Sequence, residues 1–297
     1  MSRTASPSVN KPYGVARVAQ VWNVPRSSFY AARVRAATAV VAAKRGPKTA
    51  FTDAELTESI REKIRQTPFL GEGHRKIWAR LRHAGIRTSK QRVLRLMRAA
   101  EVLAPARQPV AVNGNPHEGT IITEQPNQMW GTDATATVTV ADGQVTVFAA
   151  IDHCTAECVG IHAVKRATRF EALEPIRQGM REQFGEFSNN VAAGLQLRHD
   201  HGSQYMSDDF QKELRFLGVK SSPAFVRQPE GNGCIERFFR TLKEQLLWIR
   251  HFDDVEQLRL ALVQFRETYN RNWLLQRLHF RTPRQAREDF LAQRAAA

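Results

Sequence analysis

The feature that most constrains the fold is a stretch rich in Val, Thr, Ile and Ala over residues 129–164, MWGTDATATVTVADGQVTVFAAIDHCTAECVGIHAV. Such residues favour β-strands, and the dipeptide Asp142-Gly143 favours a tight hairpin turn. A second turn signal lies near Ala156-Glu157. The stretch therefore predicts three consecutive antiparallel strands.

The segments that follow alternate between helical and strand patterns. We predict short strands over 195–199 and 218–222, and helices over 168–184, 207–217, 234–250 and 254–271. Three meandering strands followed by alternating helices and strands are typical of an α/β fold with a mixed sheet. We therefore expect a mixed sheet of five strands, in an α/β domain that covers residues 129–290.

The N-terminal residues 1–45 have a helical pattern instead. A first amphipathic helix is interrupted by Asn-Val-Pro at residues 23–25, and a second helix opens at Arg26. This is the spacing of a helix-turn-helix unit, whose second helix commonly enters the major groove of DNA. Arg26, Ser27 and Ser28 are therefore candidate DNA contacts.

Residues 50–103 predict a second helical domain. Thr52 and Glu55 have the spacing of a capping box, and Ser89 can cap a later helix. The basic residues of that later helix lie outside its apolar stripe. Candidate phosphate contacts among them are Lys90, Arg92 and Arg95. The alternative is a solvated basic face on a packed helix.

Charge divides the chain at the segment between these domains. Residues 1–123 contain 22 Lys and Arg against 7 Asp and Glu, whereas residues 124–297 contain 22 of each. The whole excess of +15 therefore lies in the N-terminal part. This asymmetry favours a polyanion-binding part joined to a neutral part with another task, although a basic solubilising arm remains open. Residues 104–128 carry four prolines without periodicity and predict the linker.

Two further features bear on the compartment. No apolar run reaches the roughly 18 residues of a membrane-spanning helix, and the N-terminus lacks an apolar signal core. We therefore expect a cytoplasmic protein with no membrane partner.

Three acids lie where a fold has little need of them. Asp133 falls inside the first strand, where Asp is disfavoured; Asp200 follows the fourth strand; and Glu236 lies in the first turn of a long helix. Each alone could cap a turn or favour a helix N-terminus. Together they suggest an oxygen-rich site for Mg²⁺ or Mn²⁺, of which two ions can promote phosphodiester chemistry.

Zinc is the competing interpretation of the histidines near these acids. His199 and His201 alternate along a strand, so they would point to opposite faces. The run that contains His153, Cys154, Cys158 and His162 lacks the paired spacing of a zinc finger and spans a predicted hairpin. We expect these histidines to hydrogen-bond acids or DNA phosphates instead.

Three segments resemble the acidic motifs of the integrase-type DDE transposases of bacterial insertion sequences, and in particular the second-reading-frame product of that family. They are PNQMWGTDAT, LRHDHGSQYMS and GNGCIERFFRTLKEQ. The 35 residues between the last two acids also match the family. Arg198-His199 and the residues just before Asn232 depart from the usual motif, but no acid is missing.

This resemblance implies a ribonuclease-H-like catalytic core preceded by helix-turn-helix domains. It implies that Asp133, Asp200 and Glu236 are both catalytic residues and metal ligands. It implies that Lys243 contacts the transposon end. Asn232 matches the family's asparagine before the glutamate and is a further candidate DNA contact. Arg240, on the same helix face as Glu236 and Lys243, is a further candidate DNA contact.

The activity that the resemblance implies is metal-dependent cleavage and strand transfer at the ends of an insertion sequence. The expected partners are double-stranded DNA, as terminal repeats and as target, and further copies of the chain on that DNA. In the family this product is often fused to an upstream frame, and its setting is the bacterial nucleoid. The alternatives are a nuclease or resolvase that cuts without joining, and a DNA-binding regulator with an inert core.

Overall fold

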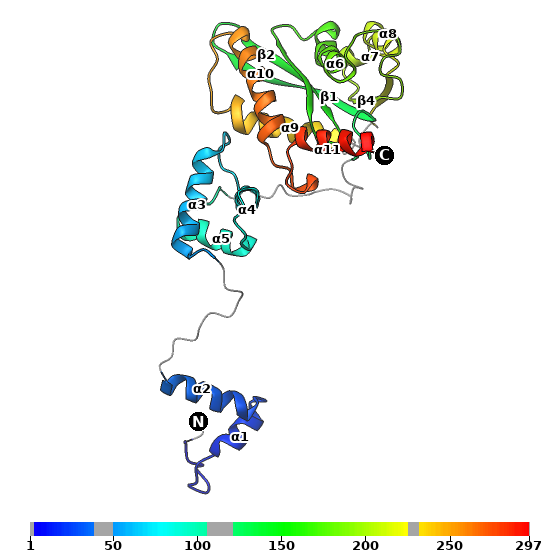
Figure 1. Ribbon diagram of the computed structural model, residues 1–297. Coiled ribbons are helices and arrows are strands. Elements are labelled where there is room, and N and C mark those ends of the chain that lie inside the picture. The colour runs from blue at the N-terminus through cyan, green and yellow to red at the C-terminus, as the bar shows by residue number, and fades with distance from the viewer. Residues whose placement is uncertain (1–2, 39–49, 106–120, 225–231, 297) are drawn as a thin grey trace. The chain divides into compact units, whose positions relative to one another are not determined.

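The computed structural model describes residues 3–38, 50–105, 121–224 and 232–296, drawn in colour in Figure 1. The chain divides into two compact units, residues 1–50 and 51–297. Each unit is described by itself. The divisions predicted at residues 1–45, 50–103, 104–128 and 129–290 stay predictions, and most of the predicted linker lies outside the described residues.

A mixed five-stranded sheet forms the centre of the second unit, in the order β3-β2-β1-β4-β5. Its strands are β1 (Met129–Thr139), β2 (Gly143–Asp152), β3 (Cys158–Val164), β4 (Gln196–His199) and β5 (Lys220–Pro223). The first three pair antiparallel, whereas β4 runs parallel to both β1 and β5. The predicted α/β fold with its mixed five-stranded sheet is therefore confirmed. β1 lies in the middle, so its residues have a strand on either side.

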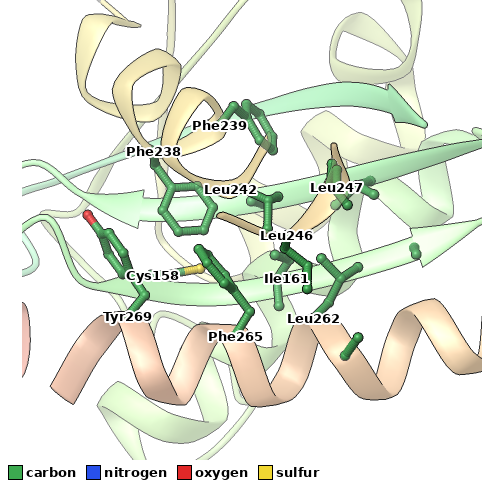
Figure 2. Close-up of a cluster of buried hydrophobic side chains, with 14 of the residues drawn as sticks. Cys158, Ile161, Phe238, Phe239, Leu242, Leu246, Leu247, Leu262, Phe265 and Tyr269 are labelled. Carbon is green, nitrogen blue, oxygen red and sulfur yellow. The ribbon is translucent and has the colours of Figure 1, made fainter. Parts of the chain in front are cut away.

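Helices cover both faces of this sheet (Figure 1). One face packs against α6 (Arg169–Phe184), α7 (Ser203–Met206) and α8 (Asp208–Phe216). The other packs against α9 (Gly233–Leu242), the π-helical turn η2 (Lys243–Leu247) and α10 (Val255–Asn272). Figure 2 shows the second core, in which Phe238 of α9 lies beside Phe265 of α10, with the strand residue Ile161 next to them.

The helices of this unit differ in detail from their predicted bounds. The predicted helix 234–250 changes from α to π geometry at Lys243, and the predicted helix 207–217 begins one residue later, at Asp208, after the separate short helix α7. A helix that the sequence did not predict, α11 (Pro283–Ala296), follows the short 3-10 turn η3 (Gln276–Leu278). Its Arg287 is buried and contacts Glu157 in the turn between β2 and β3.

The second unit also contains three N-terminal helices, α3 (Asp53–Gln66), α4 (His74–His83) and α5 (Lys90–Ala99). The predicted capping box is present, because the side chains and backbone amides of Thr52 and Glu55 bond reciprocally. Ser89 caps α5 by accepting from the amide of Arg92 at 3.1 Å. The apolar stripes of these helices meet in their own core, which includes Leu56, Ile60, Ile77, Leu81, Val93 and Met97.

The first unit contains α1 (Gly14–Val21) and α2 (Arg26–Thr38), which confirm the predicted helix pair. Among its described residues only Ala19 is a buried apolar residue, while Trp22 is 64% exposed. The pair therefore buries little apolar surface of its own. None of the described helices of the chain combines the length and hydropathy that crossing a membrane requires.

Candidate active site

Asp133 lies in the middle of β1, on the face of the sheet that α9 and α10 cover. It stands directly opposite Ala149 of β2, whose side chain belongs to the core formed with these two helices. Residues directly opposite each other in an antiparallel pair point to the same side. The side chain of Asp133 therefore leaves the central strand toward the α9 side, where it is partly buried.

Asp200 follows β4, the parallel neighbour of β1. Gly131 pairs with Arg198, so Asp133 and Asp200 each lie two residues beyond this pair on adjacent strands. The ring of His199 stabilises this strand end: its Nδ1 lies 2.6 Å from the backbone oxygen of Asp200 and its Nε2 lies 2.9 Å from Ser221 Oγ. His199 is therefore fixed by a backbone oxygen and a hydroxyl.

Glu236 comes from the first turn of α9. Ile235 and Phe239 of this helix are buried against the sheet, as their spacing predicted, and Glu236 remains exposed beside them. An acid in the first turn is also favoured by the helix dipole.

Electrostatics bring the three acids together. Burial raises the pKa of Asp133 to about 6, with a hydrogen bond from the amide of Ala134 acting in the opposite direction. The charges of Asp200 and Glu236 raise the pKa of Asp133 further, and the charge of Lys243 lowers it. The charges of Asp200, Glu236 and Lys243, which come from two other parts of the chain, therefore lie close enough to shift the pKa of Asp133.

The donor set suits a hard divalent cation, because carboxylate oxygens are the ligands that Mg²⁺ and Mn²⁺ prefer. The side chains point to local donors: Asp133 Oδ1 accepts from the amide of Ala134, and Asp200 Oδ1 from that of Gly202, both at 2.8 Å. In the described parts of the chain no three His, Cys, Asp or Glu side chains are arranged as metal ligands.

The predicted DNA contacts near the acids have different surroundings. Arg240 is exposed and its Nε donates to Glu244 at 3.0 Å, one turn along the helix. Lys243 is partly buried at the start of the π turn, a geometry that is frequent at functional sites. Asn232 is buried and its Nδ2 donates to the backbone oxygen of Thr132 at 3.3 Å, so its side chain is not presented at the surface.

The predicted contacts in the N-terminal helices also differ in exposure. Arg26, Ser27 and Ser28 are exposed in the first turn of α2. Arg92 and Arg95 both pair with Asp53 at 2.8 Å, and Arg92 is mostly buried in doing so. Part of the basic surface of α5 therefore stabilises its packing on α3.

Lys90 is exposed and lines a groove of about 500 Å³. Three further lining side chains are basic, Arg82, His83 and His279, and none of the described residues that line the groove is acidic. Lys90 Nζ lies 4.5 Å from the centre of the Trp78 ring. This groove concentrates positive charge beside the N-terminus of α5.

Two further residues lie at the site: Tyr205, which the sequence did not single out, and His153, which was considered only as a zinc ligand or a hydrogen-bonding partner of acids or phosphates. Tyr205 is buried, its ring centre lies 5.5 Å from that of His199, and burial raises its pKa well above the usual value, with smaller effects from Asp133 and Asp200. His153 is buried and its Nδ1 lies 2.9 Å from the backbone oxygen of Ile121. Tyr205 lies inside the motif that contains Asp200, and this is the sequence signal that could have drawn attention to it.

Comparisons with known protein families place two kinds of domain on the chain. Residues 123–229 and 217–287 each match a family described as "Integrase core domain", and residues 53–110 match one described as "HTH-like domain". The integrase core matches contain Asp133, Asp200 and Glu236, and the HTH-like match contains α3, α4 and α5.

Among curated proteins the chain is similar to transposases of Escherichia coli. Transposase InsD for insertion element IS2D of strain K12 is 25% identical over 293 residues, which cover 97% of this chain and 94% of that protein. Transposase InsD for insertion element IS2-9 of the same strain is also 25% identical, and the match covers 97% of this chain and 92% of that protein.

Two solved structures are also similar. A chain of the simian T-cell lymphotropic virus intasome in complex with PP2A regulatory subunit B56 gamma is 19% identical, with a TM-score of 0.47, over 80% of this chain and 74% of that one. The HTLV-2 integrase catalytic core domain in complex with magnesium is 18% identical, with a TM-score of 0.42, over 55% of this chain and 98% of that one.

Proposed function

We propose that this chain, which belongs to the InsD-like transposases, cleaves DNA at the ends of an insertion sequence and joins the freed ends to a target. It resembles these transposases distantly over nearly its full length, and it contains an HTH-like and an integrase core domain. Asp133, Asp200 and Glu236 are the catalytic acids of this proposal. They would hold Mg²⁺ or Mn²⁺, as two ions.

The observation that carries the proposal is the perturbed carboxyl group of Asp133. Asp133 lies inside a central strand, and burial together with two further acids raises its pKa to about 6. Its ionised form is therefore unfavourable, and a purely structural role does not require such a group. A bound cation removes this cost. A site that repels its own charge and binds cations is suited to phosphoryl transfer.

When bound, the metal ions supply the positive charge that lowers the pKa of an attacking oxygen and stabilises the leaving oxygen. The protein's own groups orient the reaction. Asp133 and Asp200 present carboxylates from adjacent strand positions, and Glu236 presents a third from α9. Lys243 and Arg240 would contact the backbone of the transferred strand, which fixes the in-line geometry that phosphoryl transfer needs.

The helical domains would supply DNA binding. The basic groove at Lys90 and the exposed first turn of α2, with Arg26, Ser27 and Ser28, are the surfaces with suitable charge and position. Arg95, whose side chain stays exposed beside Asp53, would add a phosphate contact, whereas Arg92 is held by Asp53 and by the backbone oxygen of Phe51. Because two ends must be joined to one target, we propose that several copies of the chain assemble on DNA.

The test is an assay with a labelled duplex that carries the end of the insertion sequence, a target plasmid and Mg²⁺. The purified chain is expected to release a 3′-hydroxyl end and to form joined products. Asp133→Asn, Asp200→Asn and Glu236→Gln are each expected to abolish both products while leaving duplex binding intact. Cleavage without joining would favour a nuclease instead, and binding without either product would favour a regulator.

A further inference from the structure

Two buried polar side chains meet over Gly131, two residues before Asp133 on β1. His153 follows β2, and Asn232 precedes α9. A methyl group placed on Gly131 would lie 2.7 Å from His153 Nε2 and 2.9 Å from Asn232 Oδ1. The two polar atoms therefore both lie over Gly131, at the place that a side chain on this residue would occupy.

Each of these two side chains makes a hydrogen bond through only one of its polar atoms among the described residues. His153 Nδ1 lies 2.9 Å from the backbone oxygen of Ile121, which can only accept, so Nδ1 carries the proton. Burial lowers the pKa of His153, so the ring is neutral near pH 7 and Nε2 is an acceptor. Asn232 donates through Nδ2 to Thr132, which leaves Oδ1 as a second acceptor. Among the described residues, neither Nε2 nor Oδ1 has a hydrogen-bond partner.

Two buried acceptors that lie over the same residue require a donor that both can reach. Water supplies two O–H donors and is the usual solution where a buried site is polar and has room for it. We propose that one buried water bridges His153 Nε2 and Asn232 Oδ1, and that His153 is thereby a positioning residue for the N-terminus of α9 and for Glu236.

The consequence for the active site follows from the chain segments that this bridge joins. Asn232 is the N-cap of α9 and lies one helical turn before Glu236. The backbone of His153 is itself held by Arg277, which donates to the backbone oxygens of His153 at 3.2 Å and Cys154 at 3.0 Å. A fixed histidine therefore sets where α9 begins relative to β1, and so where Glu236 lies relative to Asp133.

The catalytic part of this inference rests on the proposed function, but the bridge itself can be tested without activity. A crystal structure of the full chain at a resolution that shows ordered water is expected to show a density peak within hydrogen-bond distance of both Nε2 and Oδ1. A direct bond between the two side chains, or an empty space between them, would overturn the proposal.

Hydrogen exchange tests the positioning of α9 in the same way. In His153→Phe, amides in the first turn of α9 are expected to exchange about tenfold faster, with exchange in the β2 core unchanged. His162→Phe is the matched control, because His162 bonds Glu171 at 2.6 Å on the opposite side of the sheet. Unchanged exchange in α9, or equally faster exchange throughout the core, would contradict a local positioning role.

Two more variants protect the test against a failure of His153→Phe to fold. Gly131→Ala places a methyl group against both His153 Nε2 and Asn232 Oδ1, which displaces them from their shared donor, and is expected to accelerate the same amides. His153→Gln retains an acceptor and is expected to restore slow exchange in part.

In the cleavage assay, His153→Phe and Asn232→Leu are expected to raise the Mg²⁺ concentration for half-maximal rate, with the double variant no worse than the worse single one. Additive effects would mean that the two side chains share no water.

Activity separates the two proposals. If the wild type cleaves no DNA but the exchange results hold, the proposed function fails and the bridge stands. If Glu236→Gln abolishes cleavage while His153→Phe and Gly131→Ala behave as wild type in both assays, the bridge fails and the proposed function stands.

Discussion

Asp133 and Asp200 lie at the same level of two parallel strands, each two residues beyond the pair Gly131 and Arg198, and the charge of Asp200 adds to burial in raising the pKa of Asp133. Asp133 belongs to β1, in the antiparallel meander, whereas Asp200 follows β4, which comes after the crossover helix α6. It makes the titration of Asp133 a direct measure of whether the acids form one site.

The first prediction concerns this titration. In the metal-free protein, Asp133 is expected to titrate near pH 6, and Asp200→Asn is expected to lower that pKa because it removes one negative charge. Carbon-detected NMR of labelled carboxyl groups measures both values. Asp142, whose pKa is lowered mainly by Lys165, is the internal control and should not respond. A value for Asp133 near that of a free Asp would refute the shared site.

The pH dependence of cleavage follows from the same shift. Protons and metal ions compete for Asp133, so at limiting Mg²⁺ the rate is expected to fall about tenfold for each pH unit below pH 6. Saturating Mg²⁺ should move this fall to lower pH, because the bound cation favours the ionised carboxylate. Single-turnover rates at several Mg²⁺ concentrations provide the check. A profile that metal concentration does not move would argue against Asp133 as a ligand.

Stability without metal should rise when Asp133 is neutralised. The folded pKa is raised, so this group stabilises the fold below the unfolded pKa, and that contribution is lost as pH rises through about 6. At pH 8 the ionised side chain costs up to about 3 kcal/mol. Asp133→Asn is therefore expected to unfold at higher urea concentration than wild type at pH 8, with a smaller difference at pH 5.

The comparison variant for that experiment is Asp142→Asn. The lowered pKa of Asp142 means that its charge stabilises the fold above its unfolded pKa, so its removal should not stabilise the protein at pH 8. If Asp133→Asn lowered the stability at pH 8, the ionised carboxylate of Asp133 would not destabilise the metal-free protein, and this account would be wrong.

A fourth prediction concerns the buried ion pairs of α11. Arg287 contacts Glu157, which is fully buried, and lies 3.7 Å from Asp152. Arg287→Ala leaves buried negative charge without one of its partners and is expected to cost about 3–5 kcal/mol in urea unfolding. Arg281→Ala, which removes an exposed pair with Asp289, is the control and should cost less than about 1 kcal/mol. Equal effects would show that α11 does not anchor the β2–β3 turn.

A fifth prediction concerns DNA binding at the basic groove. Lys90→Gln is expected to weaken binding to all duplexes alike and to reduce the slope of log affinity against log salt by about 1. Filter binding or fluorescence anisotropy at several salt concentrations measures this slope. Lys212→Gln, on α8 outside the HTH-like domain, is the matched control. An unchanged slope would exclude phosphate contact by Lys90.

Sequence alone predicted the elements whose pattern is local. The hairpin at Asp142-Gly143 depends on a dipeptide that tolerates the positive φ of Gly143, and the capping box at Thr52 depends on residues three apart. The mixed sheet followed from the order of strands and helices. Asp133 stood out because Asp is disfavoured inside a strand. Glu236 stood out because its helix did not need an acid there to pack on the sheet.

Features that depend on distant contacts were not predicted. Helix α11 has a weak apolar stripe and is held by Arg287 through Glu157, 130 residues away, a pairing that no local pattern reveals. The change to π geometry at Lys243 leaves the apolar spacing nearly unaltered, so a single helix was expected there. Asn232 was a candidate DNA contact, but it is buried, because it donates to the backbone of β1 at the start of α9.

The most direct test of the central claim is anomalous diffraction from crystals of the full chain grown with Mn²⁺. We expect anomalous density within coordinating distance of Asp133, Asp200 and Glu236 together, with the Asp200 side chain released from the amide of Gly202. Anomalous density elsewhere, or none at these three carboxylates at saturating Mn²⁺, would contradict a shared metal site.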